Sequence, residues 1–393
     1  MPVAHLDDLL ARDVSGRRVL VRADLNVPLH EGAVSDDTRI RASLPTLRKL
    51  RDAGARVIVC SHLGRPAGEP RPEYSLRPVH AELRRLLGGE VAFCADCVGD
   101  AAQAAAKKLA NGEVLLLENL RFHPGESAND PDFARALAEL AEIYVNDAFG
   151  AAHRAHASTA GVPALIDERA AGSLMEAETD FLERVRVPER PLVVILGGAK
   201  VSDKLAVLEA LAPHADQLLI GGAMAYTFMA AEGLPTGASL VESKRIEDAR
   251  GVVRAAKSRG REVLRPTDHV VTASLEPDAE QRVVEEIPDG WLAVDIGPET
   301  AERYAGAVAL ARTCFWNGPM GIFEMPAFAK GTLRVARAMA ESPGTTVVGG
   351  GDSLAAVNQA GVGEHISHLS TGGGASLEYV QGSALPGLLA LER

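Results

Sequence analysis

The chain has few cysteines, four in 393 residues. So few thiols make a disulfide framework improbable. Cys94 and Cys97 form a CxxC motif, but no second pair offers the remaining ligands of a structural zinc site. We therefore expect the cysteines to be buried and to pack as small apolar side chains.

Aromatic residues are also scarce, at 4%, while 47% of the residues are hydrophobic and 24% are charged, which is the composition of an ordinary globular protein.

Long apolar runs are missing as well. No stretch approaches the roughly 18 apolar residues that a membrane span requires, and the acidic, early-broken N-terminal sequence MPVAHLDDLLARDVSGRR does not have the pattern of a signal peptide. These absences predict a cytoplasmic protein with no membrane partner. The formal net charge of −12 disfavours nonspecific binding to nucleic acid, so any bound anion must be held by locally placed basic groups.

The common nucleotide-binding signatures are absent too. The chain has no GxxxxGK[ST] loop, no clean GxGxxG after a strand, and no HRD or DFG motif of protein kinases. The missing GxGxxG argues against a dinucleotide-dependent dehydrogenase, which is one alternative function. A noncatalytic phosphate-binding or regulatory protein, which would bind one ligand and turn nothing over, is another.

Short β-branched runs alternate with helical stretches along the whole chain. This alternation predicts an α/β fold with parallel sheets and helices on both faces. Residues 171–186 carry apolar side chains on one helical face, and Pro188 and Pro191 follow them. We therefore expect a connecting helix at 171–186 between two α/β halves, residues 1–170 and the part of the chain that begins at 187.

The two halves place different residues after their strands, where ligands of open α/β sheets bind. The first half has basic and polar side chains there, which suit a small, highly anionic substrate. The second half has mostly glycine before helix starts, which suits the phosphates of a nucleotide. The first set is Arg22, Asp24, Asn26, His62, Arg65, Arg121, His123, Asn146, Asp147 and Arg154, and the second lies in GGAK (197–200), GGAM (221–224), NGPMG (317–321), GGGDS (349–353) and STGGGAS (370–376).

Several candidate residues also have an ordinary explanation. Lys200 and Lys204 stand four apart at an expected helix start, where repulsion costs about 0.2 to 0.5 kcal/mol unless a polyphosphate binds both; otherwise they are solvated surface lysines. Asp352 either caps the helix after the glycines or binds the magnesium of a nucleotide. His153 and His156 lack a third metal ligand, so we interpret them as a hydrogen-bonding scaffold.

Eight ordered motifs across nearly the whole chain resemble those of the phosphoglycerate kinase family: VRADLNVPL, SHLGRP, LLENLRFHPGE, VNDAFGAAHRAHAST, GGAKVSDK, FWNGPMGIFE, GGGDS and STGGGASLE. The resemblance implies two similarly sized, Rossmann-like α/β lobes joined by a helix and a hinge. Residues 1–170 would bind 3-phosphoglycerate or 1,3-bisphosphoglycerate and 187–375 Mg-ADP or Mg-ATP, with 376–393 packing back on the N-terminal lobe. It also implies reversible phosphoryl transfer with hinge-bending closure, in a monomeric enzyme of glycolysis and gluconeogenesis.

The resemblance also assigns roles to individual positions. Catalysis is expected from Arg39, Lys204 and the amides from Gly372 to Gly374, although an arginine on an early helical turn would ordinarily face solvent. The family usually has Glu-Gly-Lys where this chain has Gln381, Gly382 and Ser383, which puts the contacts of the C-terminal segment in doubt. The implied substrate-binding residues are Arg22, Asp24, Asn26, Arg39, His62, Arg65, Arg121 and Arg154. The implied nucleotide-binding residues are Lys200, Lys204, Gly221, Gly222, Asn317, Glu324 for the ribose, Gly351, Asp352 for Mg²⁺, and Ser353.

Overall fold

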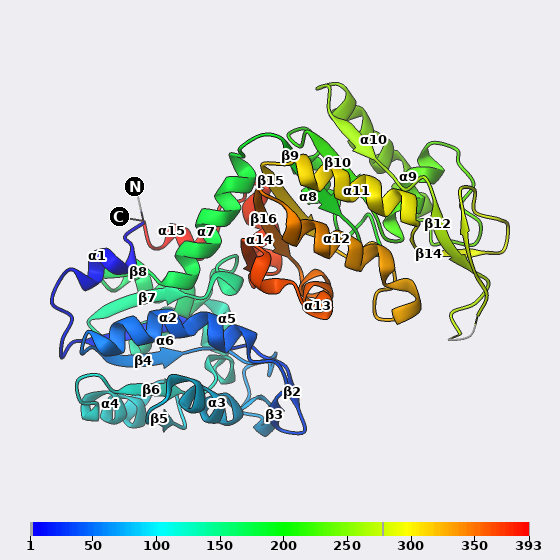
Figure 1. Ribbon diagram of the computed structural model, residues 1–393. Helices are drawn as coiled ribbons and strands as arrows, with labels where there is room; N and C mark the ends of the chain where they lie inside the picture. The colour runs from blue at the N-terminus through cyan, green and yellow to red at the C-terminus, as the bar shows by residue number, and fades with distance from the viewer. Residues whose placement is uncertain (1–2, 277–278, 393) are drawn as a thin grey trace. The chain divides into compact units, whose positions relative to one another are not determined.

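The computed structural model describes residues 3–276 and 279–392 and divides the chain into two compact units (Figure 1). Unit 1 comprises residues 1–179 and 384–393, and unit 2 comprises residues 180–383. The boundary therefore falls inside the expected connecting helix. No helix among the described residues is long and apolar enough to cross a membrane. The assignment of a binding lobe to each expected range stays a prediction.

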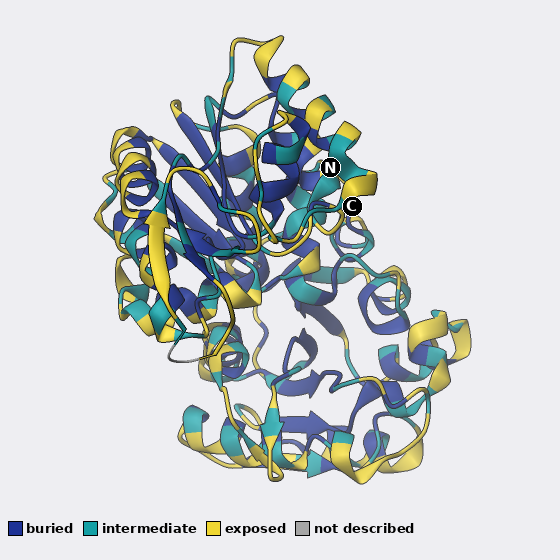
Figure 2. Ribbon diagram, turned by 90° about the vertical axis from the view of Figure 1, so that its right-hand side faces the viewer, coloured by how far each residue is buried: buried dark blue, intermediate teal, exposed yellow. Residues whose placement is uncertain are grey.

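Unit 1 is built on a six-stranded sheet in the order β5-β6-β4-β1-β7-β8, and every neighbouring pair runs parallel. The central strands β1 and β4 are buried along almost their whole length, as strands covered on both faces must be. Figure 2 shows sheet strands in the dark blue of buried residues. The predicted α/β class is confirmed here. The strands are β1 (Arg18–Ala23), β4 (Arg56–Cys60), β5 (Val91–Cys94), β6 (Val114–Leu117), β7 (Ile143–Asp147) and β8 (Glu168–Ala171), and a separate antiparallel pair is formed by β2 (Leu29–His30) and β3 (Ala33–Val34).

The helices of unit 1 begin and end at recognisable signals. Helix α3 has Pro78 in its first turn and ends at Gly88, whose φ of 69° is left-handed. Helix α6 follows Asp130, whose carboxylate accepts hydrogen bonds from two N–H groups of the first turn. The apolar faces of α2 and α3 form one core cluster with the strands. The helices are α1 (Leu6–Leu10), α2 (Thr38–Asp52), α3 (Arg77–Leu87), α4 (Gly99–Lys108), α5 (Pro124–Ala128), α6 (Pro131–Ala138) and α15 (Pro386–Leu389).

Unit 2 has a second six-stranded parallel sheet, in the order β11-β10-β9-β15-β16-β17, and a three-stranded antiparallel sheet, β13-β12-β14. The alternation of strands and helices also predicts a parallel strand for the apolar run GWLAVDIGP (290–298), and this prediction is wrong, because the run forms β14, which pairs antiparallel with β12. The strands are β9 (Leu192–Leu196), β10 (Gln217–Ile220), β11 (Glu262–Leu264), β12 (His269–Thr272), β13 (Gln281–Val284), β14 (Leu292–Ile296), β15 (Thr313–Asn317), β16 (Thr345–Gly349) and β17 (His368–Ser370).

The core of unit 2 gathers around β9, β15 and β16 and the helices that flank them. Trp316 is fully buried in it, and its indole N–H donates to the carbonyl oxygen of Gly318 at 2.7 Å. A smaller cluster around Tyr226 and Val271 joins α9 to the antiparallel sheet. The helices are α8 (Leu205–Leu211), α9 (Met224–Ala231), α10 (Ile246–Lys257), α11 (Pro298–Leu310), α12 (Lys330–Glu341), α13 (Gly351–Ala360) and α14 (Gly374–Val380).

Helix α7 (Ser173–Arg186) crosses the boundary between the two units. It ends two residues before Pro188, where the predicted stop lies. Its N-terminus is held by the buried Asp147, whose Oδ1 accepts the N–H of Leu174 at 2.9 Å. In the C-terminal part of unit 1, the N–H of Gly387 donates to the carbonyl oxygen of Ala152 at 2.8 Å.

Both parallel sheets reverse their strand order next to a central strand. In unit 1 the reversal lies at β1, between β4 and β7, and in unit 2 it lies at β9, between β10 and β15. Crevices at such points, beyond the carboxyl ends of the strands, are where open α/β sheets bind ligands. The residues that follow β1, β4, β9 and β15 are therefore the ones to examine.

Candidate active site

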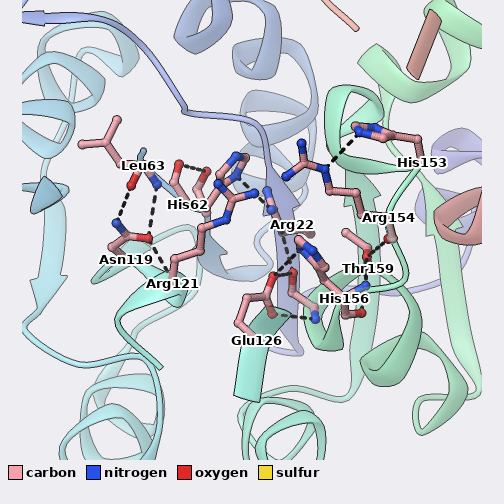
Figure 3. Close-up of polar contacts among 12 residues, drawn as sticks. Arg22, His62, Leu63, Asn119, Arg121, Glu126, His153, Arg154, His156 and Thr159 are labelled. Carbon is pink, nitrogen blue, oxygen red and sulfur yellow. Dashed lines mark hydrogen bonds and ion pairs between the residues drawn. The ribbon is translucent and has the colours of Figure 1, made fainter. Parts of the chain in front are cut away.

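Three arginines and two histidines lie near the carboxyl ends of β1 and β4 in unit 1, and we call Arg22, His62, Arg121, Arg154 and His156 the basic cluster (Figure 3). Arg22, at the end of β1, is fully buried, and its Nη2 donates to His62 Nδ1 at 3.1 Å. Burial, with the charge of Arg22 next, lowers the pKa of His62 well below 6.5. His62 is therefore neutral and accepts the hydrogen bond.

One carboxylate supports the basic cluster from within the fold. Glu126 of α5 is fully buried, and its two oxygens accept the hydroxyl and the N–H of Ser158 at 2.6 and 2.9 Å. Ser158 Oγ in turn accepts from Arg22 Nε at 2.9 Å. His156 Nδ1 lies 3.8 Å from Glu126 Oε1. Sequence reasoning missed Glu126 and Ser158 as parts of the site; their presence in matched motifs was the available signal.

Hydrogen bonds within the fold satisfy Arg121 of the basic cluster only in part. Its Nη1 donates to the carbonyl oxygen of Gly64 at 2.6 Å, but its buried Nε has no hydrogen-bond partner among the described residues. Burial lowers its pKa to about 10, and the charges of Arg22 and Arg154 add to this effect. A buried donor without a partner among neighbouring cations is what an anion-binding site presents before the anion arrives.

The remaining substrate candidates of unit 1 form a second group. Asn26 Oδ1 accepts the N–H of Gly64 at 2.8 Å, which ties the chain after β1 to the chain after β4. Arg39, in the first turn of α2, donates to the carbonyl oxygen of Asn26 at 3.1 Å and lies 3.4 Å from the buried carboxylate of Asp24. The alternative of a solvent-facing Arg39 is wrong, because its side chain is only 32% exposed and is paired. Arg65 is exposed.

Histidines near the basic cluster act as hydrogen-bonding partners. Arg154 Nε donates to His153 Nε2 at 3.0 Å, and burial lowers the pKa of His156 to about 4, with Arg121 and Arg22 contributing. The contact of His153 agrees with a hydrogen-bonding scaffold, whereas the buried Nδ1 of His156 has no hydrogen-bond partner among the described residues.

Unit 2 contains a pocket of about 380 Å³ beyond the carboxyl ends of β9 and β10. Its walls are mostly apolar, with Tyr226, Leu240 and Met320 among them, while Glu324 and Asp352 supply carboxylates. An apolar pocket with a few polar groups at its edge suits a flat heterocycle that carries charged substituents.

Glycines are required at the base of this pocket because backbones approach closely there. Gly222 has a φ of 64°, and a Cβ at this position would collide with the backbone of Gly198. A Cβ at Gly221 would collide with Met320, a residue of the pocket wall. The N–H groups of Gly221 and Gly222 already donate to Leu196 and Met320 at 2.9 Å each. These two glycines therefore shape the pocket and do not offer free amides.

Lys204 and Asn317 meet where β9 and β15 end. Lys204 is the N-cap residue of α8, and its Nζ donates to Asn317 Oδ1. Burial lowers the pKa of Lys204, and the charges of Asp203 and Asp352 oppose this effect. Lys200 lies in the preceding loop and is exposed. The expectation that both lysines stand on the first turn of a helix is therefore wrong, because the helix begins only at Leu205.

The three glycines of GGGDS allow a helix to start directly at a strand end. Gly350 is the N-cap residue of α13 with a φ of 92°, and a Cβ there would lie 2.9 Å from Asn317 Nδ2. Asp352 is in the first turn and exposed, so its interpretation as the helix cap is wrong. Ser353 is buried, and its hydroxyl accepts the N–H of Gly318 at 2.6 Å. The first N–H groups of α13, from Gly351 on, have no partners within the helix.

The second glycine-rich helix start also forms as predicted. Gly373 is the N-cap residue of α14 with a φ of 56°, Gly374 is its first residue and is exposed, and Gly372 donates to Ser370 Oγ at 3.3 Å. In the segment that departs from the family pattern, Ser383 donates its N–H to the carbonyl oxygen of Glu378 at 3.0 Å.

The chemistry of these residues fits Mg²⁺ brought in by a nucleotide. Asp352 is exposed at the pocket edge, and a carboxylate oxygen is the ligand type that Mg²⁺ prefers. The negative charge of Asp352 raises the pKa of Lys204, so the carboxylate and the ammonium group interact electrostatically. A polyphosphate with a bound cation complements both.

Comparison with known proteins decides the family. The model of the phosphoglycerate kinase family matches residues 6–383. The chain belongs to the phosphoglycerate kinase family. A phosphoglycerate kinase of Moorella thermoacetica is 56% identical over 382 residues, 96% of this chain and 97% of the relative. One of Microcystis aeruginosa is 50% identical over 400 residues, which cover 100% of both chains.

Solved structures of phosphoglycerate kinases agree with the family assignment. The structure from Coxiella burnetii matches with a TM-score of 0.90 and 38% identity and covers 99% of each chain. The structure from Pyrococcus horikoshii OT3 matches with a TM-score of 0.86 and 33% identity, covering 99% of this chain and 98% of that one. The protein is therefore an enzyme, a phosphotransferase with a carboxyl group as acceptor, and its family uses nucleotide substrates.

Proposed function

We propose that the protein catalyses the reversible transfer of the acyl phosphoryl group of 1,3-bisphosphoglycerate to ADP, giving 3-phosphoglycerate and ATP, as in glycolysis and gluconeogenesis. The single observation that carries this proposal is the buried Nε of Arg121 in the basic cluster of unit 1, which has no hydrogen-bond partner among the described residues. Such a cluster requires a compact, highly charged anion. The pocket of unit 2 supplies the complementary nucleotide site.

In unit 1 we assign Arg121 and Arg154 of the basic cluster, together with Arg65, to the phosphate of the glycerate. Neutral His62 can hydrogen-bond the glycerate without adding charge. Asp24 and Asn26 accept hydrogen bonds from its hydroxyl group or position Arg39, which contacts both residues. Arg22, being fully buried, acts through His62 and Ser158 as a positioning residue.

In unit 2 we assign the adenine to the apolar pocket, with Glu324 at its edge for the ribose. Lys200 and Lys204 neutralise the phosphates. Asn317 orients the Lys204 ammonium group. The phosphates would also meet the free N–H groups of α13 at Gly351 and Ser353, where the helix dipole favours negative charge.

The transfer step needs no covalent nucleophile. A β-phosphate oxygen of ADP attacks the phosphorus in line, the new O–P bond forms, and the bond from phosphorus to the acyl oxygen breaks, which leaves a carboxylate. We propose that Arg39, Lys204 and the amides from Gly372 to Gly374 neutralise the equatorial oxygens of the group in flight. Asp352 would hold Mg²⁺, which shields the nucleotide phosphates when it is bound.

The residues that we assign to the glycerate lie in unit 1, and those that we assign to the nucleotide lie in unit 2. The reacting atoms of an in-line transfer must come within about 3 to 3.5 Å of each other. We therefore propose that the enzyme works by hinge bending, with flexure at the ends of α7 and near Gly372 to Gly374.

We also propose that it acts as a cytoplasmic monomer. We propose in addition that it binds neither nucleic acid nor membrane, because its net charge of −12 disfavours binding to polyanionic surfaces.

A coupled assay with ATP and 3-phosphoglycerate tests the proposed reaction. ADP formation that depends on both substrates supports it, and Arg121→Ala should lower kcat/KM for 3-phosphoglycerate by tenfold or more. Arg135→Ala, which removes an exposed arginine of α6, is the matched control. Ligand binding without turnover would favour the noncatalytic alternative, and turnover that requires a nicotinamide cofactor would favour a dehydrogenase.

A further inference from the structure

A second group of ligand-type side chains lies in unit 1 outside the basic cluster. Asp96, Cys97 and His123 each offer one potential metal-ligand atom, and these atoms all lie within 4.8 Å of one another. Asp96 and Cys97 follow β5, and His123 follows the short helical turn after β6, so neighbouring parallel strands bring the three together. All three line a pocket of about 630 Å³.

The three side chains are held in place by contacts of their own. Asp96 Oδ1 accepts hydrogen bonds from the Cys97 N–H at 2.7 Å and from His123 Nε2 at 2.8 Å. Asp96 Oδ2 has no hydrogen-bond partner among the described residues. The His123 ring packs against Phe133 with 5.1 Å between the ring centroids. Cys97 is 1% exposed, whereas the other two side chains reach solvent.

Thiolate, imidazole and carboxylate together form the donor set of zinc-class cations. Soft sulfur disfavours Mg²⁺ and Ca²⁺, which prefer oxygen ligands alone. Three protein ligands beside an open pocket leave a fourth, tetrahedral position for water. We propose that Asp96, Cys97 and His123 bind a divalent cation of the zinc class. On coordination, the thiol of Cys97 and any protonated ligating nitrogen of His123 release their protons to solvent.

The metal site replaces the sequence-based interpretation of Cys97 but not that of Cys94. Both cysteines are buried, as predicted, yet Cys94 is not part of the cluster. The CxxC spacing is therefore incidental to the site. The other two proposed ligands are Asp96, one residue before Cys97, and His123, 26 residues after it. This pattern does not match the spacings of structural zinc motifs.

Titration of the full chain with Co²⁺ tests the proposal, after removal of metal with a chelator and in excess Mg²⁺, which occupies oxygen-only sites. We expect tetrahedral d–d absorption together with a sulfur-to-cobalt charge-transfer band in the near ultraviolet, both lost when Zn²⁺ is added. Cys97→Ser should abolish the charge-transfer band and weaken Zn²⁺ binding by about tenfold or more. Cys94→Ser, the matched control from the same CxxC motif, should keep the band.

A second variant guards against misfolding of Cys97→Ser. His123→Gln replaces a side chain that is 32% exposed, should fold as judged by near-ultraviolet circular dichroism, and should also weaken Zn²⁺ binding by about tenfold or more. The proposal is overturned if the wild-type chain shows no charge-transfer band, if Cys97→Ser retains it, or if His123→Gln binds Zn²⁺ like the wild type. Loss of the band in Cys94→Ser would also overturn it.

Discussion

Arg22 illustrates how single residues of this enzyme carry charge inside the fold. The guanidinium group is fully buried, and its nitrogens donate to Ser158 Oγ, His62 Nδ1 and the carbonyl oxygen of Ala23. Glu126 is linked to it through Ser158. Among the described residues no carboxylate forms a direct ion pair with Arg22, so hydrogen bonds solvate its positive charge without cancelling it, and the charge remains available to attract an anion.

Lys204 is the residue of unit 2 whose loss should affect chemistry most. We expect Lys204→Ala to lower kcat by more than tenfold with a smaller change in nucleotide affinity, because a cation that meets the moving phosphoryl group acts mainly in the transition state. Each factor of ten corresponds to about 1.4 kcal/mol. Steady-state kinetics and nucleotide titration measure the two effects. Lys257→Ala, an exposed lysine of α10, is the control, and a kcat within twofold of wild type for Lys204→Ala would contradict the role.

Asp352 should control the requirement for Mg²⁺. We expect Asp352→Asn to raise the Mg²⁺ concentration needed for half-maximal activity, because the substitution removes a negative charge from the proposed ligand. Activity measured against free Mg²⁺ at fixed nucleotide concentration checks this. Glu299→Gln removes a comparable exposed first-turn acid from α11 and is the control. An unchanged Mg²⁺ dependence in Asp352→Asn would contradict the proposed Mg²⁺ ligation. The role of Asp352 would then be limited to a favourable interaction with the helix dipole.

At the scale of elements, the antiparallel sheet of unit 2 contains a strand with an unsatisfied polar side chain. His269 of β12 is fully buried, and neither ring nitrogen has a hydrogen-bond partner among the described residues. Its ring lies 5.7 Å from that of Tyr226, which lines the pocket of about 380 Å³ in unit 2. Burial lowers its pKa to about 4. The unpaired nitrogens of His269 therefore lower the stability of the folded protein next to this pocket.

Because the unpaired nitrogens of His269 destabilise the fold, we expect His269→Phe to raise the free energy of unfolding by an amount that depends on pH. At neutral pH the variant should be more stable by about 1 to 3 kcal/mol, because no buried nitrogen is left unpaired. The unfolded histidine binds a proton below pH 6.5 and the folded one only near pH 4, so the wild type loses stability as the pH falls through this window. Between pH 7.5 and 5 the difference in the free energy of unfolding should widen by about 2 kcal/mol.

Urea unfolding at several pH values measures this difference. His365→Phe, which replaces an exposed histidine, is the matched control. Parallel stability curves for wild type and His269→Phe across pH 5 to 7.5 would show that burial does not suppress protonation of His269.

For the whole molecule, the proposed hinge bending predicts a ligand-dependent change in size. The free enzyme and each binary complex should have a larger radius of gyration than the dead-end ternary complex of 3-phosphoglycerate with Mg-ADP, because only both ligands together supply contacts that favour closure. Small-angle X-ray scattering measures this. If the radius of gyration stays the same with both ligands confirmed bound, the hinge-bending proposal fails.

Much of the architecture was predictable because hydrophobic periodicity and glycine position are local signals. The apolar runs at β1, β4, β9 and β15 and the glycine-rich starts of α13 and α14 all form as expected. The direction of β14 was not predictable, because strand pairing depends on which neighbour is available. The exact start of α8 was also missed, since no residue near Lys200 signals how far the loop extends.

The α/β class, the basic character of one half and the glycine-rich character of the other could be read from the sequence, because they follow from local composition. Folding in three dimensions was needed to show that Glu126 reaches Arg22 through Ser158, that Lys204 contacts Asn317, and that Gly350 rather than Asp352 caps α13. It also brought the potential ligand atoms of Asp96, Cys97 and His123 within 4.8 Å of one another. These contacts join residues that are close in space because strands align in a sheet, and sequence spacing carries no record of that alignment.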